Sequence, residues 1–500
     1  MAEHAGVVEH LDVLVVGAGL SGIAAAHHLL AECPDKSFAI LESRAAIGGT
    51  WDLFRYPGVR SDSDIFTLGF SFKPWAGKET IADGDAILDY MRDAAREEGI
   101  DRRIRFGHRL ASAAWNSATA RWTVQVDRVQ VDRGESLPAV IITCNFLFLC
   151  TGYYSYSQAH RPEFPGQADF GGTLVHPQFW PEGLDYRGKQ VVVIGSGATA
   201  VTLVPALAAE AARVTMLQRS PGYVFDRPRV DRMVNALRAL LPGGWGYRLA
   251  RLKFMVRDLL LYQLAVRLPA LVKRVMLLRV RSALGSATQV ASHFTPSYPP
   301  WSQRVCLVPD GDLFASLRSG KAVMETGTID RFTAGGIRLH SGKELPADII
   351  VTATGLKMEV MSGVALSVDD APVKLGDTLV YKGCMISGVP NLALAFGYAN
   401  ASWTLKAELA CRYVCRVLKH MDRTGSRMCV PHARGVQATS DPLLQLNSNY
   451  IARALVYLPK QGDRLPWKAL HNYALDILLL RLGRLEDGSL IFSKPASKGP

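Results

Sequence analysis

Residues 11–30 read LDVLVVGAGLSGIAAAHHLL and contain the glycine pattern that decides the fold. The apolar residues before the glycines predict a buried strand, and the Ala- and Leu-rich residues after them predict a helix. Between the two, Gly17 allows a tight turn, Gly19 lets a pyrophosphate approach the backbone, and Gly22 lets the helix pack on the strand. The free N–H groups at the start of such a helix bind phosphate. This order of elements predicts a dinucleotide-binding unit.

A second predicted strand, SFAIL at residues 37–41, ends at Glu42. An acid at the end of this strand is well placed to accept hydrogen bonds from the two hydroxyls of a ribose. A plain β-α-β unit with a glycine-rich turn is the alternative. The acid at the expected distance from the first glycine favours dinucleotide binding.

The same design returns at residues 189–208, KQVVVIGSGATAVTLVPALA. We expect the turn and the start of its helix to bind a second nucleotide through Gly195, Ser196, Gly197, Thr199 and Ala200. Ala200 stands where the first unit has its third glycine, and the packing role at that position permits a small residue.

The predicted strand after this second turn lies in RVTMLQRS (213–220) and ends at Arg219, where the first unit has Glu42. A carboxylate accepts hydrogen bonds from a free 2′-hydroxyl and repels a 2′-phosphate, whereas a guanidinium matches a phosphate. We therefore expect FAD in the first unit and NADPH in the second. The alternative for Arg219 is an ordinary surface residue at a strand end.

Two segments, FLFLCTGYY (146–154) and DIIVTATGL (348–356), each read as an apolar strand that ends in Thr-Gly. We interpret them as the points where the chain crosses between two domains. The expected fold class is α/β with two Rossmann-like domains. The FAD domain is then split between residues 1–155 and 371–500, with an NADP domain inserted at 156–370.

The chain has 500 residues and a net charge of +12, and its basic residues are unevenly distributed. Residues 227–281 contain 13 Lys or Arg and two acids, interleaved with large apolar residues. We expect a basic helical insertion over 227–296 that is able to lie on an anionic membrane surface. Charges interrupt it too often for a transmembrane helix. Nucleic acid is a poorer partner, because no recognised binding motif is present.

The N-terminal residues lack the basic start and apolar stretch of a secretory signal peptide. The eight cysteines show no CxxC pair and no metal-ligand spacing, and most lie in apolar segments, so we expect small buried side chains and no metal site. We expect a cytoplasmic protein, peripheral on the inner face of the membrane. A disulfide reductase with two glycine turns would need a redox-active cysteine pair near its flavin, which this sequence lacks.

Two further segments carry a family resemblance. IGGTWDLFRYPGVRSDSD (47–64) follows the ribose acid and resembles the FAD domain of flavin-dependent monooxygenases, in which Gly49, Thr50 and Trp51 would lie close to the flavin. FGGTLVHPQFWP (170–181) fits the FxGxxxHxxxWP signature of type I Baeyer–Villiger monooxygenases. The signature residues are Phe170, Gly172, His176, Trp180 and Pro181. Within this family the chain most resembles bacterial ethionamide-activating enzymes.

The resemblance implies an NADPH- and O2-dependent flavoprotein that uses a C4a-(hydro)peroxyflavin to convert a hydrophobic ketone to an ester or lactone, and to oxidise sulfides. It also implies that Arg304, in YPPWSQRVCLVP (298–309), is the catalytic arginine and that Asp62 orients it. For His176 it implies a linker role between domains. The alternative for that histidine is a packed core residue, and a general base is not needed.

Two other functions share parts of this pattern. An amine N-hydroxylase or S-oxidase of the flavin-containing monooxygenase type is disfavoured only by Trp180, Pro181 and the arginine segment. A non-catalytic, NADPH-binding membrane adaptor is the alternative of another class.

In the C-terminal part we expect a helix that starts near Trp403 and returns the chain to the flavin.

Overall fold

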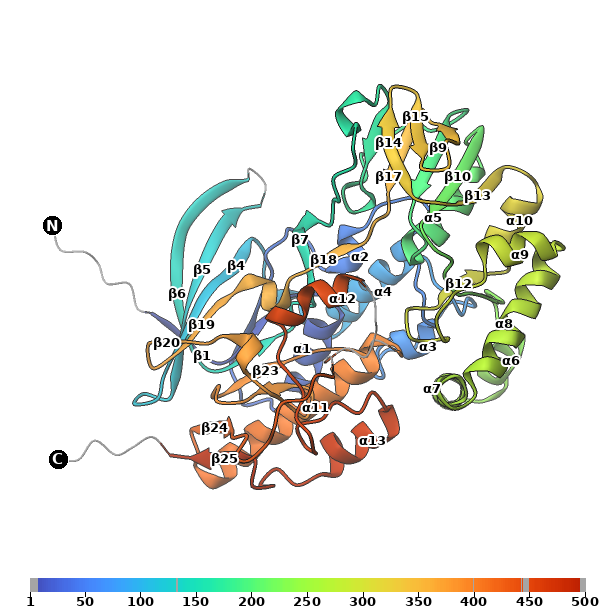
Figure 1. Cartoon of the computed structure of the whole chain (residues 1–500). Coiled ribbons are helices and arrows are strands. Elements are labelled where there is room, and N and C mark those ends of the chain that lie inside the picture. Colours follow the sequence, from blue (N-terminus) through green and yellow to red (C-terminus); the bar gives the residue numbers. More distant parts are fainter. Residues whose placement is uncertain (1–7, 132–133, 399, 442, 444–448, 495–500) are drawn as a thin grey trace, which may run out of the picture.

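The computed structural model describes residues 8–131, 134–398, 400–441, 443 and 449–494. It contains two sheets with parallel strands at their centres, each holding one of the glycine turns (Figure 1). In the first sheet β1 (Glu9–Val16) lies between β2 (Phe38–Leu41) and β6 (Glu135–Leu149) and runs parallel to both.

The other strands of the first sheet extend it on both sides. They are β3 (Ile104–Arg105), β4 (His108–Asn116), β5 (Arg121–Gln130), β19 (Ala365–Val368), β20 (Ala371–Pro372) and β23 (Leu392–Leu394). β23 returns from the C-terminal part to pair with β6, so the first sheet is built from both ends of the chain. β19 and β20 lie on either side of residue 370, so the chain rejoins this sheet before the boundary that the sequence suggested.

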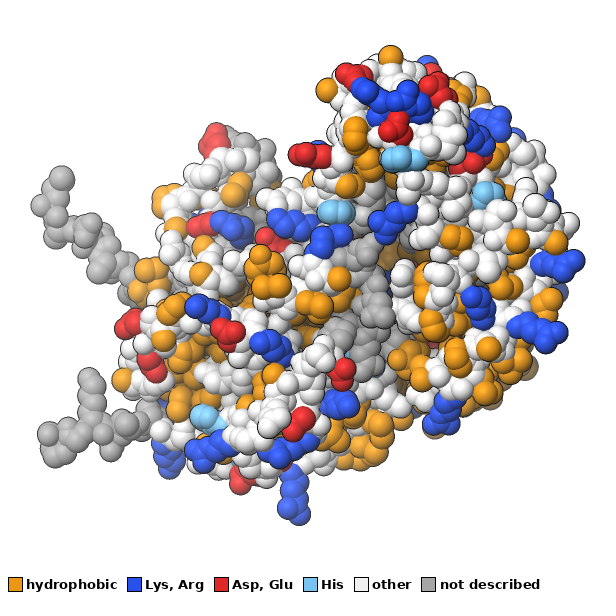
Figure 2. Space-filling view, in the orientation of Figure 1, with side chains coloured by type: hydrophobic (Ala, Val, Ile, Leu, Met, Phe, Trp, Pro, Cys, Tyr) orange, Lys and Arg blue, Asp and Glu red, His pale blue; other side chains and the backbone are white. Residues whose placement is uncertain are grey.

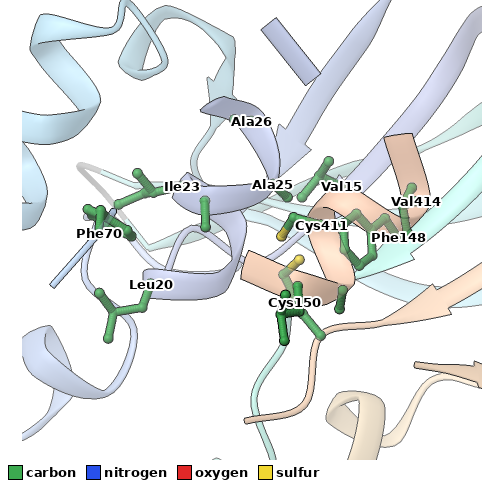
Figure 3. Packing of buried hydrophobic residues seen from close by; sticks show 14 of the residues in the cluster. Val15, Leu20, Ile23, Ala25, Ala26, Phe70, Phe148, Cys150, Cys411 and Val414 are labelled. Carbon is green, nitrogen blue, oxygen red and sulfur yellow. The ribbon is translucent and has the colours of Figure 1, made fainter. Parts of the chain in front are cut away.

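Three helices pack together on one face of the first sheet. They are α1 (Leu20–Glu32), α4 (Gly84–Glu97) and α11 (Trp403–Thr424). Figure 3 shows Val15 of β1 and Phe148 of β6 next to Ala25 of α1 and Cys411 of α11. All eight cysteines are buried and free, as the sequence predicted.

The second sheet has the order β13 (Ala322–Thr326), β10 (Arg213–Gln218), β9 (Gln190–Ile194), β17 (Ile349–Thr352) and β8 (Thr173–Val175). Its strands are parallel to one another, and α5 (Ala198–Ala208) and α10 (Asp312–Arg318) pack beside it. A small antiparallel sheet of β14 (Ile329–Thr333), β15 (Gly336–Leu339) and β16 (Glu344–Pro346) adjoins it.

The two chain crossings between the sheets pair with each other. β7 (Tyr154–Ala159) follows β6, and β18 (Leu356–Met358) follows β17, and these two strands are antiparallel partners. We call the part of the chain that contains the first sheet the first half, and the part that contains the second sheet the second or inserted half. The chain therefore leaves and re-enters the first half through one two-stranded connection.

Four helices form the predicted insertion next to the second sheet. They are α6 (Arg232–Leu240), α7 (Trp245–Arg267), α8 (Pro269–Leu284) and α9 (Ala287–His293). α8 packs on β11 (Val224–Arg227), which pairs with β12 (Cys306–Pro309). α7 instead packs on α3 (Ile65–Leu68) of the first half, so the insertion contacts both halves.

The remaining C-terminal elements lie next to α11 or, for α12, against β18 at the chain crossing. They are β21 (Val380–Tyr381), β22 (Met385–Ile386), β24 (Met428–Pro431), α12 (Asn449–Ala454), α13 (Tyr473–Ile477), a π-helical turn at Leu478–Leu482 and β25 (Leu490–Ser493). Within the described residues, no helix has the length and apolar character needed to span a bilayer.

Candidate functional site

The first glycine turn is shaped as a nucleotide cradle. Gly17 has φ of +103°, and a Cβ there would lie 2.6 Å from the carbonyl oxygen of Cys150. A Cβ on Gly22 would lie 1.8 Å from the oxygen of Gly17, so α1 packs against the turn only because this residue is glycine. The backbone therefore lies open to a ligand at the start of α1.

Glu42 is buried at the end of β2, beside the first turn. Its Oε2 accepts a hydrogen bond from the N–H of Ala18 at 2.8 Å, and its Oε1 accepts one from the N–H of Arg44 at 2.9 Å. Oγ of Ser43 also donates to Oε1, at 3.4 Å. These bonds fix the carboxylate at the edge of the cradle, and Oε2 has a further lone pair for a ribose hydroxyl. The position of Glu42 therefore fits its predicted role of binding the hydroxyls of a ribose.

The segment Gly48–Trp51 (GGTW) lies against the first glycine turn and closes the side of the cradle next to Gly19. Gly49 has φ of +55° and begins α2 (Thr50–Leu53), and a Cβ on it would lie 3.2 Å from the Cα of Gly19 and 3.0 Å from the Oη of Tyr156. Burial raises the pKa of Tyr156 to about 12, so its hydroxyl stays protonated next to Thr50.

A cavity of about 490 Å³ begins at this cradle and extends toward the second half. Its volume lies in the range typical of cofactor and ligand sites. Its walls include predicted residues from both halves, namely Gly17, Gly19, Glu42, Gly49, Thr50, Trp51, Asp62, Thr199 and Arg304. The structure thus brings the first glycine turn, the start of α5 and the candidate catalytic pair to one space.

Asp62 and Arg304 form an ion pair across this cavity, with Nε of Arg304 2.7 Å from Oδ2 of Asp62. Asp62 follows α2 in the first half, and Arg304 lies just before β12 in the second half. Both side chains are partly exposed to the cavity. A guanidinium stays protonated at any physiological pH, so this pair places a fixed positive charge in the cavity.

The second glycine turn has the same shape. Gly195 has φ of +146°, and a Cβ there would lie 2.4 Å from the oxygen of Ala353. A Cβ on Gly197 would meet no atom within 4 Å, so open space lies at the N-terminus of α5. Ala200 is buried against β9, and the oxygen of Ser196 lies 3.9 Å from Sγ of Cys306. These residues fit a second nucleotide.

Arg219 is exposed directly after β10. It lies at the same edge of the sheet as the second glycine turn, which follows the parallel strand β9. Its place corresponds to that of Glu42 after β2. The guanidinium lies in solvent at the strand end, as a 2′-phosphate contact requires. It does not line the main cavity among the described residues.

The signature segment 170–181 lies along the edge of the second half. Phe170 meets Phe332 edge-on, and a Cβ on Gly172 would lie 2.3 Å from the oxygen of Asp348. Trp180 packs edge-on against Tyr186, and Pro181 is exposed. None of the five signature side chains lines the main cavity within the described part of the chain.

His176 of the signature segment is 5% exposed and is linked to the chain crossing through Gln178. Its Nδ1 accepts a hydrogen bond from the N–H of Gln178, and Nε2 of Gln178 in turn donates to the oxygens of Ser155 and Tyr156 at the crossing. Burial lowers the pKa of His176 to about 4, so the ring is neutral near pH 7. The geometry favours a positioning role and not a general base.

Several cavity residues were not singled out from the sequence. Tyr156, Thr202 and Tyr398 line the cavity with the predicted ones. They occupy ordinary positions on strands, helices and loops, and no spacing pattern marks them. Tyr398 donates to Asp476 at 2.5 Å, and Trp403 donates to Ser21 at 2.8 Å at the start of α11.

A smaller pocket of about 90 Å³ lies on the other side of Arg304. Arg227 and Asp258 line it, and the guanidinium of Arg257 lies between Asp258 and the fully buried Asp64. Burial and the neighbouring Asp258 raise the pKa of Asp64 to about 6. This buried ionic group connects α3 to α7 next to Arg304.

Comparison with known proteins agrees with this geometry. Residues 15–74 match the family model for NAD(P)-binding Rossmann-like domains, and residues 79–234 match the model for flavin-binding monooxygenase-like proteins. The FAD-containing monooxygenase EthA of Mycobacterium tuberculosis is 50% identical over 495 residues, which cover 99% of this chain and 100% of EthA. The probable FAD-binding monooxygenase AlmA of Acinetobacter is 45% identical over 488 residues, 97% of each chain.

Solved structures show the same fold at low sequence identity. An oxidized steroid monooxygenase bound to NADP matches with a TM-score of 0.74 and 21% identity, over 97% of this chain and 100% of that one. A polycyclic ketone monooxygenase from Thermothelomyces thermophila matches with a TM-score of 0.76 and 18% identity, over 98% and 90% of the two chains.

Proposed function

Because this chain belongs to the family of FAD-containing monooxygenases, we propose that Arg304 and Asp62 direct its oxygen transfer to ketone carbonyls and to sulfides. As a member of that family it holds FAD, takes electrons from NADPH and transfers an atom of O2 to a small-molecule substrate. The finer assignment, oxygen insertion next to a ketone to give an ester or lactone, rests on the Arg304–Asp62 pair.

We propose that the two glycine turns divide the cofactors. Gly17, Gly19, Gly22 and Glu42, together with Gly48–Trp51 (GGTW), would hold FAD in the half that contains the first sheet, which the chain re-enters at β19 and not at residue 371. The inserted half at 156–370 would hold NADPH through its turn, Thr199 and Arg219. The support is the two strained glycine backbones and the opposite charges at the matching strand ends.

When bound, FAD would activate O2, which provides the transferred oxygen atom, and NADPH would provide the hydride that reduces the flavin. The protein has to stabilise negative charge that develops during transfer, and a fixed cation in an enclosed cavity does this far better than water does. Arg304 is that cation in the proposal, and the carboxylate of Asp62, 2.7 Å away, holds its side chain in the cavity. The shared cavity allows both cofactors to reach the same space.

A substrate panel tests the proposal. The purified enzyme is given NADPH and ¹⁸O2 with ketones, aldehydes, sulfides and amines, and products are identified by mass spectrometry. We expect labelled esters or lactones and labelled sulfoxides. Labelled N-oxides or S-oxides without any ester would instead support the amine N-hydroxylase or S-oxidase alternative.

We also propose that the enzyme binds peripherally to an anionic membrane on the cytoplasmic side. The exposed residues of α7 and α8 form what we call the insertion surface. Its large apolar members are Trp245, Leu249, Leu252, Val256, Leu260, Leu264, Val266, Leu271, Val275 and Leu278, and its basic members are Arg248, Arg267, Arg274, Arg279 and Arg281. Four of the leucine and valine positions on α7 repeat every fourth residue and so share one helix face.

The charge balance of the insertion supports this partner. Residues 232–293 contain one acid, Asp258, and that acid lies against Arg257 on the inner side. A mixed apolar and basic helix face of this kind suits the headgroup region of an anionic bilayer. Flotation with vesicles of phosphatidylglycerol and phosphatidylcholine at low salt tests it, and protein left at the bottom of the gradient would refute it.

A further inference from the structure

A second exposed apolar face lies in the C-terminal part, outside the insertion. Leu475 of α13 and Leu478 and Leu482 of the following turn are 45%, 55% and 71% exposed. Their spacing places them on one side of the helical segment, while Asp476 and Leu480 of the same segment are buried. Exposed leucines on one face of a helix indicate that the face has a partner.

This segment and α7 are held by neighbouring residues of one helix, α11. Nζ of Lys406 lies 2.8 Å from Oδ1 of Asp476, and both side chains are buried. Two residues further along α11, Glu408 pairs with Arg251 of α7 at 3.2 Å, again with both side chains buried. Breaking a buried ion pair of this kind is costly, so α11 fixes α7 and α13 relative to each other.

Other contacts bring the two elements close. Arg251 donates to the backbone oxygens of Phe66 and Gly69, which anchors α7 on the first half. The charge of Arg251 also acts on the phenol of Tyr473, the first residue of α13. Figure 1 places α13 next to α7, and Figure 2 shows hydrophobic side chains gathered over α7, α8 and α13 at the lower right.

Basic side chains flank the leucines here as they do on α7. Arg481 and Arg484 are exposed beside Leu482, and the acid of α13, Asp476, is neutralised inside by Lys406. The exposed acid that follows, Glu486, lies 2.9 Å from the ring of His420, so the two arginines dominate the charge next to the leucines. An apolar face with a basic margin matches an anionic lipid surface, since the leucines enter the headgroup region and the guanidinium groups meet phosphates.

From this arrangement we infer that Leu475, Leu478 and Leu482, which we call the C-terminal surface, form with the insertion surface one platform that docks on an anionic lipid bilayer. The inference rests on the proposed peripheral membrane binding. It adds a second contact, contributed by the half of the chain that carries the first glycine turn. Two contacts fixed on one helix hold the enzyme in a single orientation, because a single helix face would let it rotate about the helix axis.

Vesicle partitioning of the full-length, FAD-loaded enzyme tests the inference. The vesicles contain phosphatidylglycerol and phosphatidylcholine, with pure phosphatidylcholine as the neutral comparison. The double substitution Leu478→Asp with Leu482→Asp removes the C-terminal surface, and Leu260→Asp with Leu264→Asp removes part of the insertion surface. Val456→Asp is the matched control, because Val456 is 76% exposed but lies after α12, next to Gly376.

We expect each double variant to partition at least about tenfold more weakly than the wild-type enzyme. Each variant loses two leucines that would enter the bilayer, and each gains two carboxylates that the anionic lipids repel. The Val456→Asp control should partition as the wild type does. FAD content and thermal unfolding report folding, and if the first double variant fails to fold, Leu482→Asp alone should reduce partitioning about threefold.

The outcomes separate the inference from the proposal on which it rests. If the insertion variant loses binding and the C-terminal variant binds as wild type, the inference is overturned and membrane binding stands. If the wild-type enzyme does not bind the anionic vesicles, both fall. If the C-terminal variant changes only the sedimentation coefficient of the free enzyme, the surface binds a second copy of the chain and the inference is wrong.

Discussion

Arg304 and Asp62 lie 2.7 Å apart across the main cavity, although one precedes β12 in the inserted half and the other follows α2 in the first half. The ion pair therefore depends on the two halves being docked against each other. It also places the fixed positive charge next to the residues that cradle the first nucleotide.

Asp62→Asn should weaken oxygen transfer to ketones by about ten- to a hundredfold, because a charge-assisted hydrogen bond contributes about 1.5–3 kcal/mol. The reduction of the flavin by NADPH should change little, since Asp62 acts by holding Arg304. Rapid mixing without oxygen measures the reduction, and product analysis measures the transfer. The control is Asp185→Asn, which breaks an exposed ion pair with Arg187 outside the cavity.

Arg219→Ala should reduce the preference for NADPH over NADH by about ten- to a hundredfold, because the guanidinium is the proposed partner of the 2′-phosphate. The ratio of kcat/KM for the two nucleotides measures it. Arg213→Ala removes an exposed arginine at the other end of the same strand and should leave the ratio unchanged. A wild-type enzyme that uses NADH as readily as NADPH would contradict the assignment.

Gly197→Ala should fold normally but raise the KM for NADPH at least about tenfold. Its backbone is not left-handed and a Cβ meets no protein atom within 4 Å, so the added methyl group occupies only the space proposed for the pyrophosphate. FAD content and thermal unfolding should match the wild type. Gly335→Ala, also with no atom within 4 Å, is the control and should change neither KM nor stability.

His176 should make stability depend on pH. Its pKa is about 4 in the folded chain and about 6.5 in the unfolded chain, so between these values the unfolded chain binds more protons. Stability should therefore fall as the pH is lowered from 6.5 to 4, by about 1–3 kcal/mol from this group. His176→Gln should flatten that part of the slope in urea unfolding, whereas His340→Gln, at an exposed site, should not. An unchanged slope would show that the pKa of His176 is the same in the folded and unfolded chains.

The sequence was most informative where the backbone itself needs glycine. Gly17, Gly22 and Gly195 stand where any Cβ would meet a backbone oxygen, so their spacing predicted both turns and the α/β class. The pairing of Asp62 with Arg304 followed from the family resemblance, because no local pattern links two positions so distant in the chain. The start of α11 at Trp403 was also predicted correctly.

Long-range packing explains what the sequence did not reveal. Tyr156 reaches the cavity from β7, and Tyr398 reaches it from the loop between β23 and α11. Nothing in their local sequence distinguishes them from other tyrosines. The return to the first sheet at β19 precedes the expected boundary at residue 370, because a four-residue edge strand has too little pattern to detect. The anchoring of α7 by the ion pair between Arg251 and Glu408 was not predicted either, because no local pattern links two residues so distant in the chain.

The most direct test of the account is the Arg304→Ala enzyme, loaded with FAD and given NADPH, ¹⁸O2 and a ketone that the wild type converts. We expect flavin reduction at close to the wild-type rate and consumption of NADPH and O2 without matching ester formation. The amount of labelled ester should fall at least about a hundredfold. Normal amounts of labelled ester from this variant would contradict the central claim that Arg304 directs oxygen transfer.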